Sequence, residues 1–157
     1  MPKPFIVTGR FLVSVEGNSG CLWKYHVAGG GPVFSFAPPV FEVDGQKVVA
    51  VLAGSPVPGV ERRLRNGCTE TSFSGLLAVD PDLILEAVFR WGNSPFVRFH
   101  YLLRCASGRK LTKVSGRDSL SYLSVDMTPA GDMTEVRLSE FNQVVHGFCP
   151  SERKLEE

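Results

Sequence analysis

The clearest pattern of hydrophobic and polar positions lies between residues 82 and 105, where two alternating runs flank a short turn. Residues 83–91 carry hydrophobic side chains at every second position, and the same two-residue period returns in residues 97–105. Aromatic and β-branched residues in such an alternation, bounded by turn-forming residues, predict β-strands. The sequence Gly-Asn-Ser-Pro at positions 92–95 supplies the turn. This segment therefore predicts a long β-hairpin.

Shorter segments with the same period extend this interpretation along the chain. Phe5–Val15 predicts a single first strand, Asp44-Gly45 is a strong hairpin-turn signal, and residues 133–145 fit either a helix face or a strand. Further strands are expected at Cys21–Val27, Val33–Phe36, Val40–Val43, Lys47–Leu52, Thr69–Leu77, Leu111–Val114 and Leu120–Met127. Roughly ten strands with frequent turns predict an all-β fold with little helix. We expect an antiparallel two-sheet β-sandwich, with a barrel as the alternative.

The length of 157 residues suits one domain with a full hydrophobic core. Hydrophobic residues make up 43% of the chain and charged residues 21%, close to the averages of globular proteins, so the composition argues against disorder. We expect a single β-sandwich domain over residues 1–149, whose core forms between the apolar faces of the long alternating runs. The charged residues at 150–157 are interpreted as a tail or linker.

Net charge and targeting signals narrow the range of partners. A formal net charge of +1 gives no electrostatic basis for binding nucleic acid or an anionic membrane, so neither partner is expected. The N-terminal residues lack the apolar core of a signal peptide, and no apolar run approaches the roughly 20 residues of a membrane helix. We therefore expect a cytoplasmic protein. We expect its four cysteines to be thiols, with a disulfide between two of them as the alternative. The cysteines are Cys21, Cys68, Cys105 and Cys149.

The sequence lacks motifs for catalysis, metal binding and cofactor binding. Its histidines at 26, 100 and 146 are far apart and its cysteines have no C-x-x-C spacing, so no metal site and no cofactor are expected. The glycines at 29–31 are not followed by the lysine and hydroxyl residue of a phosphate loop. The basic run at 62–67 has the charge to bind an anion, but a solvated loop is favoured because Glu61 adjoins it. We predict no catalytic residue.

Aromatic side chains are more informative about binding. Trp23, Tyr25 and Trp91 are candidates to stack on the apolar side of a sugar ring, since aromatic faces favour amphipathic partners. Arg98 and His100 share one strand face and are candidates to hydrogen-bond sugar hydroxyls. The alternatives are core packing for each aromatic residue and an ordinary solvent face for the polar pair. Trp91 is expected near the rim of the sandwich, Trp23 lies between glycine-rich loops, and any sugar affinity should be weak.

Two segments resemble a known protein family. Residues 95–103 read Pro-Phe-Val-Arg-Phe-His-Tyr-Leu-Leu, with Asp80-Pro81-Asp82-Leu83 before them and Tyr122-Leu123 after them. The later segment 135–142 reads Glu-Val-Arg-Leu-Ser-Glu-Phe-Asn and is followed by His146. Within residues 60–150, these sequences resemble the N-terminal β-sandwich of family 36 glycoside hydrolases, which are α-galactosidases and their relatives.

The resemblance implies a specific fold and role. In such enzymes the N-terminal domain is a large antiparallel supersandwich, similar to galactose mutarotase, and it packs on a (β/α)₈ barrel that holds the catalytic aspartate and the acid/base. A chain of 157 residues has no room for that barrel. The resemblance therefore implies a non-catalytic domain that supports carbohydrate recognition or assembly. Its partners would be a carbohydrate ligand, a downstream catalytic barrel or further copies in a homo-oligomer.

Two other functions stay open. The first is a stand-alone sandwich or barrel that binds a small ligand with no link to sugars. The second is a mutarotase-like epimerase, which needs a histidine and a glutamate as acid and base. The three histidines together with Glu70, Glu86 and Glu140 supply those residue types, but the chain is short for that family.

Overall fold

The computed structural model describes residues 4–18, 20–94, 96–112, 123–128, 134–138 and 143–147. In these residues all regular secondary structure is β-strand, and the strands pair antiparallel. The prediction of an antiparallel all-β fold is therefore confirmed. The chain divides into two compact units, residues 1–127 and residues 128–157. The tail expected at 150–157 lies outside the described residues.

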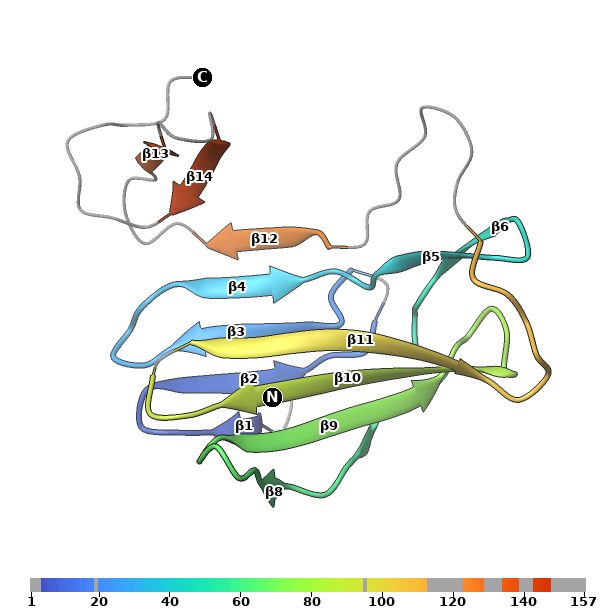
Figure 1. Cartoon of the computed structure of the whole chain (residues 1–157), viewed down its shortest axis with the longest axis horizontal. Helices are drawn as coiled ribbons and strands as arrows, with labels where there is room; N and C mark the ends of the chain where they lie inside the picture. The colour runs from blue at the N-terminus through green and yellow to red at the C-terminus, as the bar shows by residue number, and fades with distance from the viewer. Residues whose placement is uncertain are drawn as a thin grey trace. The chain divides into compact units, whose positions relative to one another are not determined.

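The first five-stranded sheet contains the N-terminal strands in the order β1-β2-β3-β4-β12. Its first four strands follow one another along the chain, and β12 joins at the edge from a distant part of the sequence (Figure 1). Next to β12, the Ala37 amide donates a hydrogen bond of 3.0 Å to the Ser124 carbonyl. The strands are β1 (Pro4–Val7), β2 (Phe11–Val15), β3 (Trp23–Val27), β4 (Val33–Phe36) and β12 (Val125–Thr128).

The second sheet is built around the predicted long hairpin. Its order is β11-β10-β9-β7, and β8 also pairs with β9. β10 and β11 pair along their whole length, from Leu83 opposite Cys105 to Trp91 opposite Val97, which confirms the hairpin. The strands are β7 (Val57–Pro58), β8 (Arg62–Arg63), β9 (Thr69–Leu76), β10 (Leu83–Trp91) and β11 (Val97–Cys105).

Two further hairpins complete the described strands. β5 (Val40–Val43) and β6 (Gln46–Val49) are joined by the predicted turn, in which Asp44 has φ 50° and Gly45 has φ 79°. Two successive positive φ angles are the mark of a type I′ turn. In the second unit, β13 (Thr134–Leu138) pairs with β14 (Gln143–Gly147). The described parts of the segment that fitted either a helix or a strand, residues 134–138 and 143–145, are therefore paired strands.

The expectation of one strand over Phe5–Val15 is wrong, because the chain reverses between β1 and β2. The Thr8 hydroxyl oxygen accepts hydrogen bonds from the amides of Arg10 at 3.2 Å and Phe11 at 3.0 Å. A hydroxyl that caps nearby amides stabilises a turn. The alternation of buried and exposed side chains also changes phase here. In β1 the even-numbered Ile6 is 4% exposed and the odd-numbered Val7 is 67% exposed, whereas the odd-numbered Phe11 and Val13 of β2 are buried.

Several other expected strands have different limits. The first strand after the Asp44 turn ends at Val49, although Leu52 still forms an isolated bridge with Leu77. Leu111 forms an isolated bridge with Val43, and the rest of its expected strand, after residue 112, lies outside the described residues. The loop expected at Arg62–Arg63 is instead the short strand β8, which pairs with Glu70 and Thr69 of β9.

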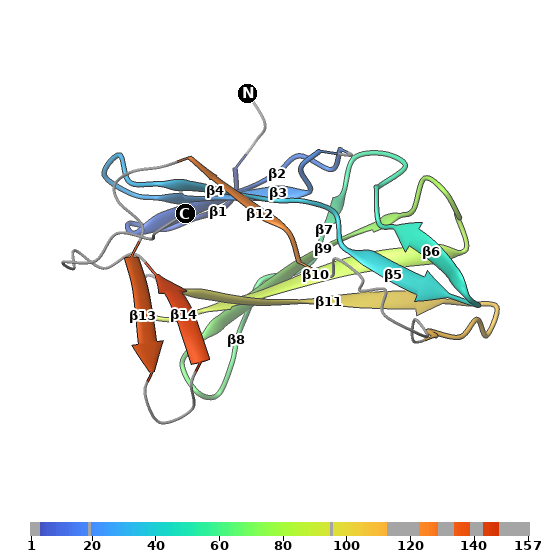
Figure 2. The same cartoon turned by 90° about the horizontal axis from the view of Figure 1, so that it is seen from above.

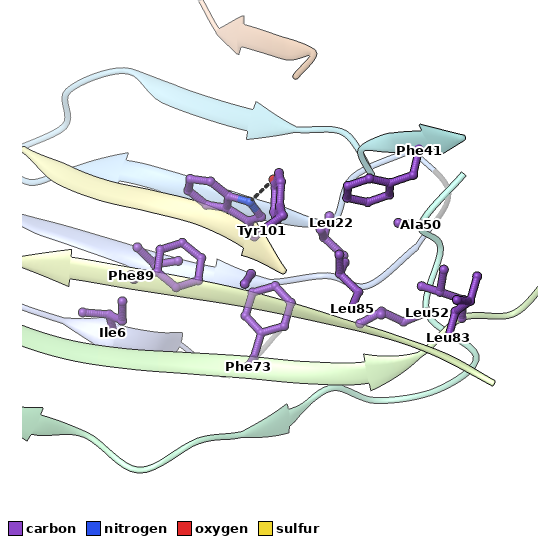
Figure 3. Close-up of a cluster of buried hydrophobic side chains, with 14 of the residues drawn as sticks. Ile6, Leu22, Phe41, Ala50, Leu52, Phe73, Leu83, Leu85, Phe89 and Tyr101 are labelled. Atoms are coloured by element: carbon purple, nitrogen blue, oxygen red, sulfur yellow. Dashed lines mark hydrogen bonds between the residues drawn. The ribbon is translucent and has the colours of Figure 1, made fainter. Parts of the chain in front are cut away.

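The two five-stranded sheets pack face to face, and aromatic rings fill the space between them. Phe5 of β1 meets Phe73 of β9, with ring centroids 5.7 Å apart. Trp23 of β3 meets Phe89 of β10 at 5.0 Å and Phe99 of β11 at 4.9 Å. Figure 2 shows the two layers edge-on, and Figure 3 shows the buried side chains between them. The predicted β-sandwich is therefore the observed architecture.

Candidate functional site

A row of four charged residues crosses the outer face of the second sheet. Arg62 of β8 is in register with Glu70 of β9, Glu70 with Arg90 of β10, and Arg90 with Arg98 of β11. Glu70 is 4% exposed although it carries a charge. Its Oε1 accepts hydrogen bonds from Arg62, including one of 2.7 Å from Nε, and its Oε2 accepts one from Arg90 Nε. Both oxygens of this buried carboxylate are therefore satisfied.

The same hydrogen bonds control the ionisation of Glu70. Hydrogen bonds from Arg90 and Arg62 hold the pKa of Glu70 below its ordinary value, and the desolvation caused by burial opposes them. A carboxylate with a lowered pKa and two occupied oxygens is poorly suited to acid–base catalysis. Glu70 instead fixes Arg62 and Arg90 on the sheet.

Arg98 ends the row without a carboxylate. In the part of the chain that the structure describes, it forms no ion pair, and its in-register neighbour is the like-charged Arg90. Like charges directly opposite each other on neighbouring strands are destabilising. The exposed guanidinium of Arg98 is therefore available to bind a polar or anionic group.

A cleft of about 570 Å³ lies beside the turn that joins β10 to β11. Its lining includes Trp91 and Asn93 near the turn, Asn66 from the β8–β9 connection, and Arg98 and His100 from β11. Three of the five residues predicted to bind sugar, Trp91, Arg98 and His100, therefore meet in one place. The cleft joins an aromatic ring to several hydrogen-bonding groups.

Trp91 is held in place from the core side. It is half-buried, and its ring meets Phe11 edge-on, with centroids 6.5 Å apart and an interplanar angle of 89°. It also lines a second cleft of about 460 Å³, together with Arg10 and Arg63. As the last residue of β10, Trp91 lies at the rim of the sandwich, next to the turn.

Trp23 and Tyr25 do not line this cleft. Trp23 is fully buried, stacks on Phe36 at 3.7 Å, and donates a hydrogen bond of 2.8 Å from its indole nitrogen to the Tyr101 hydroxyl. In this fold it is a core residue with no face open to a ligand. Tyr25 is half-buried and stacks on Phe11 at 5.2 Å, and burial raises the pKa of its phenol. The inward phase of β3 explains why both rings turn toward the sandwich interior.

The histidines are separated in the structure as well. His100 is exposed on β11, opposite Val88. His26 lies on β3 of the other sheet, where its Nε2 is 3.3 Å from the Ser14 hydroxyl. The side chain of His146 lies outside the described residues. His100 is therefore the histidine that the structure places in the cleft.

Sequence reasoning missed Arg90 and Asn66 in the lining of the cleft, and it considered Glu70 only as a possible epimerase acid or base, not as the centre of a row of ion pairs. A signal for Glu70 was present, since it is the only charged residue in the alternating run 69–77 and its side chain is buried. Burial of a lone carboxylate requires a charged partner. Arg62 and Arg90 are those partners, but their proximity depends on strand register.

The cysteine, histidine and acidic side chains do not assemble a metal site in the described parts of the chain. No group of three or more histidine, cysteine, aspartate or glutamate side chains there is arranged to hold a metal ion. Cys21, Cys68 and Cys105 are free thiols, and Cys149 lies outside the described residues. No helix in the described residues has the length and apolar character needed to cross a membrane.

Comparisons with known proteins found no matching family model, no matching curated protein and no matching solved structure.

Proposed function

We propose that this chain is a non-catalytic β-sandwich domain of an α-galactosidase-type glycoside hydrolase, and that the cleft beside the β10–β11 turn recognises carbohydrate. The observation that carries the proposal is the meeting of Trp91, Arg98 and His100 in that cleft. A sugar presents an apolar ring face and a rim of hydroxyl groups. An anchored indole suits the ring face, and exposed nitrogen donors suit the hydroxyls.

Other groups in the cleft support recognition of hydroxyls. The guanidinium of Arg98 offers several N–H donors in a planar arrangement. The Asn66 side chain is oriented by a hydrogen bond of 3.1 Å that its Oδ1 accepts from the Cys68 amide. This bond leaves the Asn66 amino group as a donor. Two or three directional bonds and one stacked ring predict weak but selective binding.

The non-catalytic part of the proposal rests on the acidic residues. Hydrolysis of a glycoside requires two carboxyl groups on either side of the scissile bond. No carboxylate from the described residues lines the cleft. On the adjacent sheet face, Glu70 is occupied by two arginines and Glu86 accepts a hydrogen bond of 2.5 Å from Arg104. These contacts leave neither Glu70 nor Glu86 free to act with a histidine as the acid–base pair of an epimerase.

Tryptophan fluorescence tests the proposal, because the chain has only two tryptophans and they differ in burial. We expect iodide to quench one emission component, and galactose or raffinose to shift that component at millimolar concentration. The response should vanish in Trp91→Phe and weaken in Arg98→Ala. Arg65→Ala, which removes an exposed arginine from the neighbouring loop, is the matched control and should respond like the wild type. A sugar response that persists in Trp91→Phe, or no response at all, would contradict the proposal.

A small anionic ligand with no link to sugars is the second candidate. It is favoured by Arg98, which has no carboxylate partner in the described residues and lies opposite Arg90. Titration with inorganic phosphate in the same assay separates the two ligands. A response to phosphate that Arg98→Ala removes, with none to galactose, would favour the anion.

A further inference from the structure

We propose that β11 accepts an additional β-strand from a protein partner, and that this strand alternates hydrophobic with acidic residues. β11 is nine residues long and stands at the end of the second sheet, where β9, β10 and β11 lie in that order (Figure 1). Among the strands that the structure describes, none pairs with its outer edge. A strand at the end of a sheet, with half-buried side chains such as those of Val97, Phe99 and Leu103 along its outer edge, is a template for strand addition.

The hydrogen bonds of the sheet identify which backbone groups face that edge. The Leu77 amide donates to the Leu83 carbonyl at 3.0 Å, so odd-numbered residues of β10 bond to β9. In an antiparallel sheet the direction alternates, and even-numbered residues of β10 therefore bond to even-numbered residues of β11. It follows that Val97, Phe99 and Leu103 direct their amide and carbonyl groups away from the sheet.

The side chains of β11 specify what the added strand should look like. Val97, Phe99 and Leu103 are half-buried and pack against the core, which leaves the core incompletely covered along this edge. An added strand would cover these side chains if its own inward residues were hydrophobic. The outward residues of β11 include the arginines Arg98 and Arg104, both exposed.

Charge complementarity gives the added strand its acidic residues. The row Arg62, Glu70, Arg90, Arg98 alternates in sign until its last member, where two positive charges adjoin. A carboxylate beside Arg98 on an added strand would restore the alternation. Opposite charges on neighbouring strands are favourable, and like charges directly opposite are not.

The same charges argue against a second copy of this chain as the occupant. Two β11 strands paired antiparallel about residue 101 would place Arg98 of each copy opposite Arg104 of the other. In each such contact Arg98 would meet Arg104, whose charge is already paired with Glu86 of β10, so this pairing would bring no carboxylate to Arg98. The arginines therefore disfavour self-association and favour a segment of opposite charge.

Hydrogen exchange of the full chain measured by NMR, with a defined peptide as the probe, tests this proposal. The peptide is an acetylated heptamer of alternating valine and glutamate, and its control replaces glutamate by lysine. In the free protein the amides of Val97, Phe99 and Leu103 should exchange rapidly. The glutamate peptide should protect them, with an affinity about tenfold higher than that of the lysine peptide.

Two variants sharpen the test. Arg98→Glu should reverse the preference between the peptides. Arg10→Glu makes the same charge change on the β1–β2 turn of the other sheet and should leave the preference unchanged. The proposal would be overturned if the three amides were already protected in the free monomer or if neither peptide protected them at millimolar concentration. Protection that rises with protein concentration alone would instead identify a second copy as the occupant and would equally overturn it.

Discussion

Replacing Phe89 by alanine should remove a large part of the stability of this domain. Phe89 is fully buried, and its ring centroid lies 5.0–5.9 Å from those of Phe5, Trp23 and Phe73. The substitution removes these contacts and leaves a cavity between the two sheets. Substitutions of this kind cost about 3–5 kcal/mol, and small domains have only about 5–15 kcal/mol in total.

Phe96 provides a matched control for this substitution. It is 79% exposed, so Phe96→Ala removes the same atoms from the surface and should change the free energy of unfolding by less than about 0.5 kcal/mol. Equilibrium unfolding in urea, followed by tryptophan emission, measures both variants. With an m-value of about 2 kcal/mol/M, Phe89→Ala should lower the urea midpoint by about 2 M.

A smaller change at the same position guards against a variant that fails to fold. Phe89→Leu keeps most of the volume and should cost about 1–2 kcal/mol. Equal urea midpoints for Phe89→Ala and Phe96→Ala would show that Phe89 is not buried between the two sheets, and would refute the face-to-face packing described above.

The remaining predictions concern the acid stability given by Glu70, the redox state of the cysteines and the absence of glycoside hydrolysis. Because the folded-state pKa of Glu70 is lowered, its stabilisation is present above its unfolded pKa of about 4.3 and is lost as the pH falls through the folded pKa. Glu70→Gln should therefore lower the free energy of unfolding by about 1–2 kcal/mol at neutral pH and flatten the acid dependence of urea unfolding. An acid dependence equal to that of the wild type would contradict the role of Arg62 and Arg90. Titration of the denatured protein with a thiol reagent, without reductant, should report four free thiols, and a count of two would reveal a disulfide. The purified chain should not hydrolyse a chromogenic α-galactoside, and turnover abolished by mutating one acidic residue would refute the non-catalytic role.

The long hairpin was predictable because its alternation is uninterrupted over nine residues on each side of an unambiguous turn. The reversal between β1 and β2 was not. There the turn depends on the Thr8 hydroxyl, which caps the amides that follow it, while the hydrophobic period continues through Gly9. A side-chain cap of this kind leaves only a weak trace in a hydrophobic pattern.

The candidate site was predictable only where it depends on local sequence. Trp91 adjoins a turn, and a residue at the end of a strand lies at the rim of a sheet. The burial of Trp23 depends on Phe89 and Phe99, which are brought opposite it by the packing of the other sheet. The ion pairs of Glu70 likewise depend on the register of three strands. Such long-range relations are not encoded in the spacing of residues along the chain.

Carbohydrate recognition by the cleft is tested most directly by a galactose titration followed in proton–nitrogen correlation spectra of the full chain. The two tryptophans give separate indole N–H signals. We predict that the indole signal of Trp91 and the backbone amides of Arg98 and His100 shift together along one weak binding curve, while the indole signal of the buried Trp23 stays in place. A spectrum unchanged at high millimolar galactose, or shifts confined to residues outside the cleft, would contradict carbohydrate recognition at this site.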